Sequence, residues 1–213
     1  MAPCYGPRHM NSRRILGFIR RLLRGEDVIL VLQDKPAWER QFRKRTWDRL
    51  TSGQPNTDAI AKRIKELCAK RERIRVLDVG CGNGGLAHAL GEFPPNLTYL
   101  GTDLSETAIA AAKATKPNAA FEATRAEDVP RERNFNCIVF NEVFLYIDAK
   151  RILPLYRSAF PEALINISIE RSWRSWFLWR RVRKYVHLMT RETLEHTRRR
   201  TLHRDVATGR FIL

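Results

Sequence analysis

A glycine-rich segment after a short apolar stretch is the first place where this sequence could bind a ligand. The stretch Val76-Leu77-Asp78-Val79 is followed at once by glycines at positions 80, 82 and 84. Glycines let the backbone approach a ligand closely and enter the next helix through a tight turn. Taken alone, the pattern also fits a plain strand-to-helix turn, so it needs a second feature beside it.

A carboxylate about 20 residues further along the chain supplies that feature. Asp103 follows the apolar stretch Tyr99-Leu100-Gly101-Thr102. An acidic side chain at the carboxyl end of the second strand can accept hydrogen bonds from both hydroxyls of a ribose. Because ligands of open α/β sheets bind outside the carboxyl ends of the strands, the loop and the carboxylate describe one site.

These two segments resemble the first two motifs of class I S-adenosylmethionine-dependent methyltransferases. Asp-Val-Gly-Cys-Gly-Asn-Gly at 78–84 and Gly-Thr-Asp-Leu-Ser at 101–105 carry the resemblance. Dehydrogenases space their glycines as Gly-x-Gly-x-x-Gly, whereas Leu86 and Ala87 occupy the region of that third glycine here. The resemblance implies S-adenosyl-L-methionine as cofactor and S-adenosyl-L-homocysteine as product.

The resemblance continues downstream and adds residues to the predicted cofactor site. The segment 126–130 is similar to the stretch that contacts adenine, although Arg125 replaces a common aspartate, and 135–146 is similar to the fourth strand and its loop. Residues 45–49 resemble the stretch before the core, where an aromatic ring can close over the cofactor. The cofactor-binding residues implied in this way are Asp78, Gly80, Cys81, Gly82, Asp103, Leu104, Ala126, Glu127, Asn141 and Trp47.

Two residues after the fourth predicted strand are candidates for catalysis. Methyl transfer from a sulfonium is an in-line displacement on an activated donor, so alignment can supply much of the rate. A general base is needed only if the acceptor must lose a proton early. Glu142 is the predicted base, and Tyr146, one helical turn further, would orient the acceptor. The alternative for Glu142 is a structural carboxylate that binds loop amides.

The basic flanks of the chain bear on its partners. The net charge is +16, with a slightly acidic centre and strongly basic ends, which favours an acidic partner such as phosphate, an anionic lipid surface or RNA. Trp173, Trp176 and Trp179 lie among arginines after the fifth strand, and residues 12–24 form a basic amphipathic pattern. Both segments fit an anionic membrane surface. The alternatives are a lid helix with its aromatics in the core and a helix packed on the domain.

A small-molecule or lipid-linked anionic acceptor, a saccharide methylated on oxygen or nitrogen, is the expected substrate. The segment 140–146 resembles short bacterial methyltransferases of saccharides and lipid-linked glycans, including the nodulation N-methyltransferases. RNA methylation is the alternative, and a non-catalytic partner subunit is the second alternative. The four cysteines have no paired spacing, so we expect no metal and a cytoplasmic protein, peripheral at the inner membrane face where it meets lipid.

Alternating apolar strands and helices must position these residues. Strands are expected at 75–79, 98–101, 120–123, 137–141 and 164–169, helices at 57–70, 84–91, 106–113 and 149–159, and a hairpin at 197–203 and 209–213 around a turn at 207–209. The predicted fold is α/β, a doubly wound, mostly parallel seven-stranded sheet with a C-terminal antiparallel hairpin. Residues 55–213 would form the cofactor-binding domain and 1–54 a basic N-terminal helical extension. Gly-Pro-Arg-His-Met at 6–10 resembles a cloning scar, so 1–9 are interpreted as a tag remnant.

Overall fold

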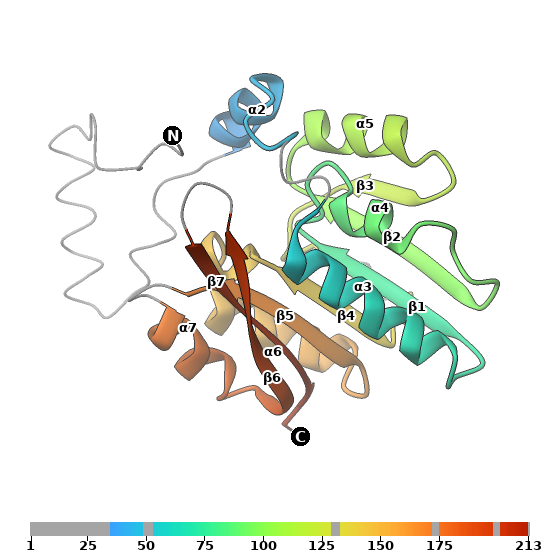
Figure 1. The fold of residues 1–213 in the computed structure, drawn as a ribbon. Helices are drawn as coiled ribbons and strands as arrows, with labels where there is room; N and C mark the ends of the chain where they lie inside the picture. The colour runs from blue at the N-terminus through green and yellow to red at the C-terminus, as the bar shows by residue number, and fades with distance from the viewer. Residues whose placement is uncertain (1–34, 49–52, 129–132, 172–174, 198–200, 213) are drawn as a thin grey trace, which may run out of the picture.

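One seven-stranded sheet with helices on both faces organises the described part of the chain (Figure 1). The computed structural model describes residues 35–48, 53–128, 133–171, 175–197 and 201–212. Its helices are α2 (Lys35–Arg43), α3 (Pro55–Cys68), α4 (Gly85–Leu90), α5 (Glu106–Thr115), α6 (Ala149–Ala159) and α7 (Ser175–Val182), with a 3-10 turn, η3, at Val143–Leu145. Its strands are β1 (Ile74–Val79), β2 (Leu97–Asp103), β3 (Ala120–Ala123), β4 (Cys137–Asn141), β5 (Leu164–Glu170), β6 (Val186–Thr197) and β7 (Thr201–Phe211).

The strand order is β3-β2-β1-β4-β5-β7-β6. The five strands from β3 to β5 are parallel, and β7 runs antiparallel to both β5 and β6. Because β1 lies in the middle and the chain leaves it first to one side and then to the other, the carboxyl ends of β1, β2 and β4 meet at one edge. The predicted doubly wound, mostly parallel sheet with a C-terminal hairpin is confirmed.

Two apolar layers enclose the sheet. One cluster includes Ile60 of α3, Leu86 of α4 and Ile109 of α5. The other includes Ile152 of α6 and Leu178 of α7. Strands covered on both faces are expected to be apolar throughout, and all residues of β4 except the last are buried. None of the described helices is long and apolar enough to cross a membrane.

Side chains at the helix starts explain where two of the helices begin. Ser105 accepts a hydrogen bond from the Ala108 amide at 3.1 Å and begins α5. Asp148 accepts one from the Lys150 amide at 2.9 Å and begins α6. Such caps satisfy backbone amides that the first helical turn leaves without partners.

The predicted position of the hairpin turn was wrong. Residues 207–209 lie inside β7, not at a turn, and β6 and β7 meet on either side of residues 198–200, which lie outside the described part of the chain. Gly209 pairs with Leu188 beside a register shift, and a Cβ built there would lie 2.5 Å from the His187 carbonyl oxygen. The glycine therefore permits a close approach of two backbones, which is the other common reason for a glycine within a strand.

The described tryptophans of the arginine-rich segment have opposite environments. Trp179 is 3% exposed, and its Nε1 donates to Asp205 Oδ2 at 3.0 Å. Trp176 is 61% exposed, beside the 46% exposed Phe177. The expectation of a lid helix with its aromatics in the core therefore holds for Trp179 and not for Trp176. Trp173 and the predicted helix at 12–24 lie outside the described residues.

Asp205 joins α7 to the hairpin, and its loss should destabilise the fold. The carboxylate is 1% exposed and accepts hydrogen bonds from Trp179, Arg191 and Thr193. Removing a buried charge leaves its partners unpaired, so Asp205→Ala should lower the free energy of unfolding by about 3 kcal/mol. Urea denaturation measures this. Asp128→Ala, on an exposed residue, is the control, and equal stability of the two variants would contradict the assigned role.

Candidate active site

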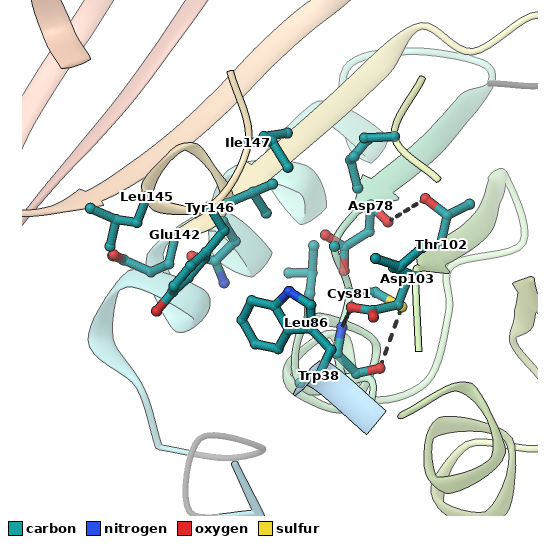
Figure 2. Close-up of a pocket in the computed structure, with 18 of the residues that line it drawn as sticks. Trp38, Asp78, Cys81, Leu86, Thr102, Asp103, Glu142, Leu145, Tyr146 and Ile147 are labelled. Carbon is teal, nitrogen blue, oxygen red and sulfur yellow. Dashed lines mark hydrogen bonds between the residues drawn. The ribbon is translucent and has the colours of Figure 1, made fainter. Parts of the chain in front are cut away.

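A cavity of about 650 Å³ opens at the carboxyl edge of the parallel strands. Figure 2 shows Asp78 and Asp103 on one side of it and Glu142 and Tyr146 on the other. The structure brings all the predicted site residues together in the lining of this cavity: Trp47, Asp78, Gly80, Cys81, Gly82, Asp103, Leu104, Ala126, Glu127, Asn141, Glu142 and Tyr146. Residues that sequence reasoning missed line it too, among them Trp38, Phe42, Asn56, Glu170 and Arg204.

The glycine loop is held by β2 as it leaves β1. The amides of Gly80 and Cys81 both donate to the Thr102 carbonyl, at 2.7 and 2.9 Å. Gly80 has a φ of +71°, and a Cβ built there would lie 2.7 Å from Cγ2 of Val143. Only glycine fits this turn without strain, because a side chain would meet both an unfavourable backbone conformation and the next loop.

Asp103 ties the glycine loop to the end of β2. Its Oδ2 accepts from the Gly82 amide and its Oδ1 from the Ser105 amide, both at 2.9 Å. Burial raises the pKa of this carboxyl, and the two amide hydrogen bonds lower it. A carboxylate oxygen has room for more than one donor. The two amides therefore fix the orientation of the Asp103 carboxylate, which can still accept hydrogen bonds from two vicinal hydroxyls.

Asp78 is a buried carboxyl with one oxygen left over. The Tyr99 hydroxyl donates to Oδ2 at 2.7 Å, whereas Oδ1 is buried without a hydrogen-bond partner. Burial raises the pKa of Asp78 to about 7. An unpaired acceptor on the cavity wall suits a ligand that brings a positively charged hydrogen-bond donor.

Aromatic rings of α2 and the turn after it cover the cavity. The Trp38 ring lies edge-on to Tyr146, with centroids 4.9 Å apart, and Trp47 lies 6.5 Å from the same tyrosine. Glu39 fastens α2 to the start of α5, because its carboxylate accepts hydrogen bonds from the amides of Glu106 and Thr107. Residues 35–48 thus contribute to the same site as the segment from 55 onward, across the boundary expected between 54 and 55.

Asn141 is locked by the start of α3. Its Oδ1 accepts from Asn56 Nδ2 at 2.7 Å, and its Nδ2 donates to Thr57 Oγ1 at 3.0 Å. Both ends of the amide are therefore engaged within the protein. Pro55 begins α3 in a position that proline favours, so the helix presents Asn56 and Thr57 in its first turn.

Glu142 follows β4 in a left-handed backbone conformation, with φ at 61°. Its Oε1 accepts from Ser168 Oγ at 2.6 Å and its Oε2 from the Glu170 amide at 2.8 Å. Arg204 Nε lies 3.5 Å from Oε1. Burial raises the pKa of Glu142, while Ser168 and Arg204 lower it. The carboxylate therefore binds a backbone amide, as expected if its role is structural. It also lines the cavity, as expected of a general base.

Comparison with known proteins places this site in a family. Residues 70–170 match the sequence model of the methyltransferase domain family. These residues form a class I, S-adenosylmethionine-dependent methyltransferase domain. The matched segment runs from the end of α3 to the end of β5, so it contains the glycine loop, Asp103, Asn141 and Glu142.

Curated relatives match only around this domain. The release factor glutamine methyltransferases of Coxiella burnetii and Bradyrhizobium diazoefficiens are each 30% identical, over 98 and 105 residues, which is 46% and 48% of this chain. The chain spans 35% of the length of either relative.

Solved structures show the same fold at low sequence identity. Magnesium protoporphyrin IX methyltransferase from Synechocystis with bound cofactor is 14% identical, with a TM-score of 0.60, covering 83% of this chain and 97% of that one. The N-methyltransferase NodS from Bradyrhizobium japonicum is 15% identical, with a TM-score of 0.59, covering 74% and 97%. A second NodS structure, in complex with S-adenosyl-L-homocysteine, is 13% identical with a TM-score of 0.55 over 94% of this chain and 99% of that one.

The residues of this methyltransferase domain fit S-adenosylmethionine. Asp103 has a carboxylate fixed by two amides, which would accept hydrogen bonds from the ribose hydroxyls. The orphaned Oδ1 of Asp78 offers an acceptor for the cationic methionine end. Gly82 leaves space on the cavity wall, since a Cβ built there would meet nothing nearer than Phe42 at 3.8 Å. When bound, the cofactor supplies a methyl group on a positively charged sulfur.

Asp103→Ala should abolish most of the affinity of the methyltransferase domain for S-adenosylhomocysteine. The variant loses both ribose hydrogen bonds and frees the Gly82 and Ser105 amides, at a cost of about 3 kcal/mol or roughly a hundredfold in Kd. Isothermal titration calorimetry measures the affinity. Glu162→Ala, on an exposed residue outside the cavity lining, is the control, and an unchanged Kd in Asp103→Ala would rule out the ribose role.

Proposed function

We propose that this chain transfers a methyl group from S-adenosylmethionine to an oxygen or nitrogen atom of a small or lipid-linked acceptor, a saccharide in the first instance. The observation that carries the proposal is the placement of Glu142. Its half-buried carboxylate shares one cavity with Asp103, the residue proposed to bind ribose. A proton acceptor and a methyl-donor site on opposite walls are the two parts required by a transfer in which the acceptor must lose a proton early.

Each part of the cavity has a proposed task in this reaction. The loop at 78–84 and Asp103 hold the donor, and the rings of Trp38, Trp47 and Tyr146 limit the access of water. Tyr146, 38% exposed, meets the acceptor at the mouth. Alignment of acceptor and methyl group then provides the rate, and Glu142 takes up the proton that the acceptor releases.

A glutamine amide is the acceptor that the names of the curated relatives suggest. Two observations weigh against carrying it over. The match covers about a third of those relatives. The amide of Asn141, the last residue of β4, is engaged at both ends by Asn56 and Thr57 and so is not free to bind a substrate amide. A small acceptor remains the better proposal.

Glu142→Gln should abolish most methyl transfer without weakening the cofactor site. The glutamine keeps the size of the side chain but cannot take up a proton, so a loss of about a hundredfold in kcat is expected. Tritium from the labelled methyl donor is followed into glycolipid and saccharide, RNA and protein fractions, with Glu162→Gln on the surface as control. Label confined to RNA or to protein would overturn the proposed acceptor class.

The pH dependence of the same reaction is a second test of Glu142 as the general base. Its pKa lies above the usual 4.5, so kcat/KM should rise with pH through that raised value as the carboxylate forms. Arg204→Met removes a charge that lowers the pKa and should move the rise to higher pH, whereas Arg204→Lys should move it less. An unmoved profile in Arg204→Met would exclude Glu142 as the titrating base.

We also propose that α7 docks on an anionic membrane, where a lipid-linked acceptor would be found. Trp176 and Phe177 project from this helix, and the Arg180 guanidinium lies over the Trp176 ring, 5.6 Å from its centroid. Arg183 and Lys184 are exposed just beyond the helix. Exposed aromatic rings flanked by cations suit the headgroup region of an anionic bilayer. The charge of an acidic lipid would meet these residues and not Glu142.

Arg180→Glu with Arg183→Glu should release the protein from anionic vesicles. Each basic residue near such a surface contributes about 1 kcal/mol, so this reversal should lower the partition coefficient at least about thirtyfold. Lys62→Glu with Lys70→Glu makes the same change in net charge around α3, on the opposite face of the sheet (Figure 1), and should have a far smaller effect. Equal losses in both double variants, or equal binding to neutral vesicles, would contradict docking through α7.

A further inference from the structure

Among the described residues, the end of the cavity beside β5 has more negative than positive charge. Glu142 follows β4 and Glu170 ends β5, and both line the cavity. Arg204 of β7 carries the positive charge beside them. It lies opposite Glu170 in the strand pairing, and its Nε is 3.5 Å from Glu142 Oε1. In the described part of the chain, one guanidinium beside two carboxylates leaves a net negative charge in a partly buried place, where solvent screens charge poorly.

Asn56 adds a buried acceptor atom that has no partner. Its Nδ2 donates to Asn141 Oδ1 at 2.7 Å and to Ser168 Oγ at 3.0 Å. The Oδ1 of Asn56 is buried without a hydrogen bond, although the residue lines the cavity and is 3% exposed. Buried acceptors of this kind are rare in folded proteins and call for an explanation.

The orientation of this amide is fixed by its neighbours. Ser168 gives its one proton to Glu142 Oε1 at 2.6 Å. Its oxygen must therefore accept the bond from Asn56, which requires the nitrogen of the amide on that side. Turning the amide over would place Oδ1 against an oxygen that has no proton left to offer. The unpaired oxygen is thus a property of the network and not of an arbitrary choice of rotamer.

We propose that this end of the cavity binds a protonated amine, so that the methylated atom of the acceptor is a nitrogen. The inference rests on the proposed methyl transfer and narrows it. An ammonium group offers three donors and one positive charge. Asn56 Oδ1, Glu142 and Glu170 offer acceptors and a net negative charge. A hydroxyl acceptor would satisfy one of these acceptors and leave the charge unbalanced.

The aromatic cover suits the same ligand. Trp38 and Trp47 have ring centroids 5.8 Å apart, and Trp38 contacts Tyr146 at 4.9 Å. Faces of aromatic rings attract cations, most strongly where water is excluded. Positive charge passes from sulfur to nitrogen during transfer to an amine, so these rings border a site that stays cationic throughout.

The proton balance assigns a step to Glu142. The bound ammonium first gives one proton to the Glu142 carboxylate, which frees the nitrogen lone pair. That pair forms the new bond to the methyl carbon as the carbon–sulfur bond breaks and its electrons stay on sulfur. The product is a methylated ammonium, and Glu142 returns its proton to solvent when the product leaves. One proton is released for each methyl group transferred.

Binding of matched probes to the protein loaded with S-adenosylhomocysteine tests this assignment. Each probe pair differs only in an amine or a hydroxyl: glucosamine and glucose, galactosamine and galactose, phenylethylamine and phenylethanol. Saturation-transfer difference NMR gives the affinities without any turnover. At least one amine should bind ten times more tightly than its hydroxyl partner. Glu170→Gln should reduce that preference severalfold, and Asn56→Leu should do so through the unpaired oxygen, while Glu162→Gln should leave it unchanged.

The outcomes separate this inference from the proposed function. If S-adenosylhomocysteine binds and the hydroxyl partners bind as well as the amines, or no probe binds, the amine site is overturned and the methyl transfer proposal stands. If S-adenosylhomocysteine itself does not bind, the proposed function fails, and the amine site fails with it. An amine preference that survives in Glu170→Gln and in Asn56→Leu also overturns the assignment, and the calorimetric affinity for S-adenosylhomocysteine shows whether each variant is folded.

Discussion

The whole site depends on how β1 is paired between β2 and β4. Val79 stands opposite Thr102 on one side and Phe140 on the other, so three strands end at the same level. The chain leaving β1 is then captured by the Thr102 carbonyl, which accepts two consecutive amides of the glycine loop. Asp103, the residue after Thr102, accepts a hydrogen bond from the next part of the loop, the Gly82 amide. A shift of register by one residue would turn every side chain in β1 to the other face of the sheet, and the loop would lose these partners together.

The cover over the cavity is attached through few contacts compared with the floor beneath it. The floor consists of strands buried on both faces, whereas α2 has no fully buried residue. Its attachment depends on Glu39, whose carboxylate caps the first turn of α5 and so lies next to the positive end of a helix dipole. The Lys35–Glu106 ion pair beside it is exposed and adds little. An element without a fully buried residue, held by this carboxylate and by ring contacts such as that of Trp38 with Tyr146, can separate from the floor at less cost than a strand of the sheet.

Those parts of the molecule that depend on local patterns could be predicted from the sequence. Apolar runs located the parallel strands within a few residues, and the glycine loop with Asp103 predicted one edge of the cavity, because both signals reside in short segments. Gly209 misled the prediction, since a glycine in a turn and a glycine at a close strand crossing look alike in a sequence. Asn56 and Arg204 were missed for a different reason. They reach the site from α3 and β7, elements remote in sequence from Glu142, and only the assembled sheet shows that an amide meets Ser168 and a guanidinium meets Glu142.

The hydrogen bonds around Ser168 all start from the Asn56 amide. Asn56 donates to both Asn141 and Ser168, and the Ser168 hydroxyl in turn donates to Glu142. Asn141 and Glu142 both line the cavity, and the Asn56 amide and the Ser168 hydroxyl connect them through a chain of hydrogen bonds. If Glu142 is protonated, it becomes a donor and competes with Asn56 for the serine oxygen, and the direction of the chain can reverse. Events at the two ends are then thermodynamically linked, and such linkage is reciprocal: whatever one ligand does to the affinity for the other is returned by the same factor.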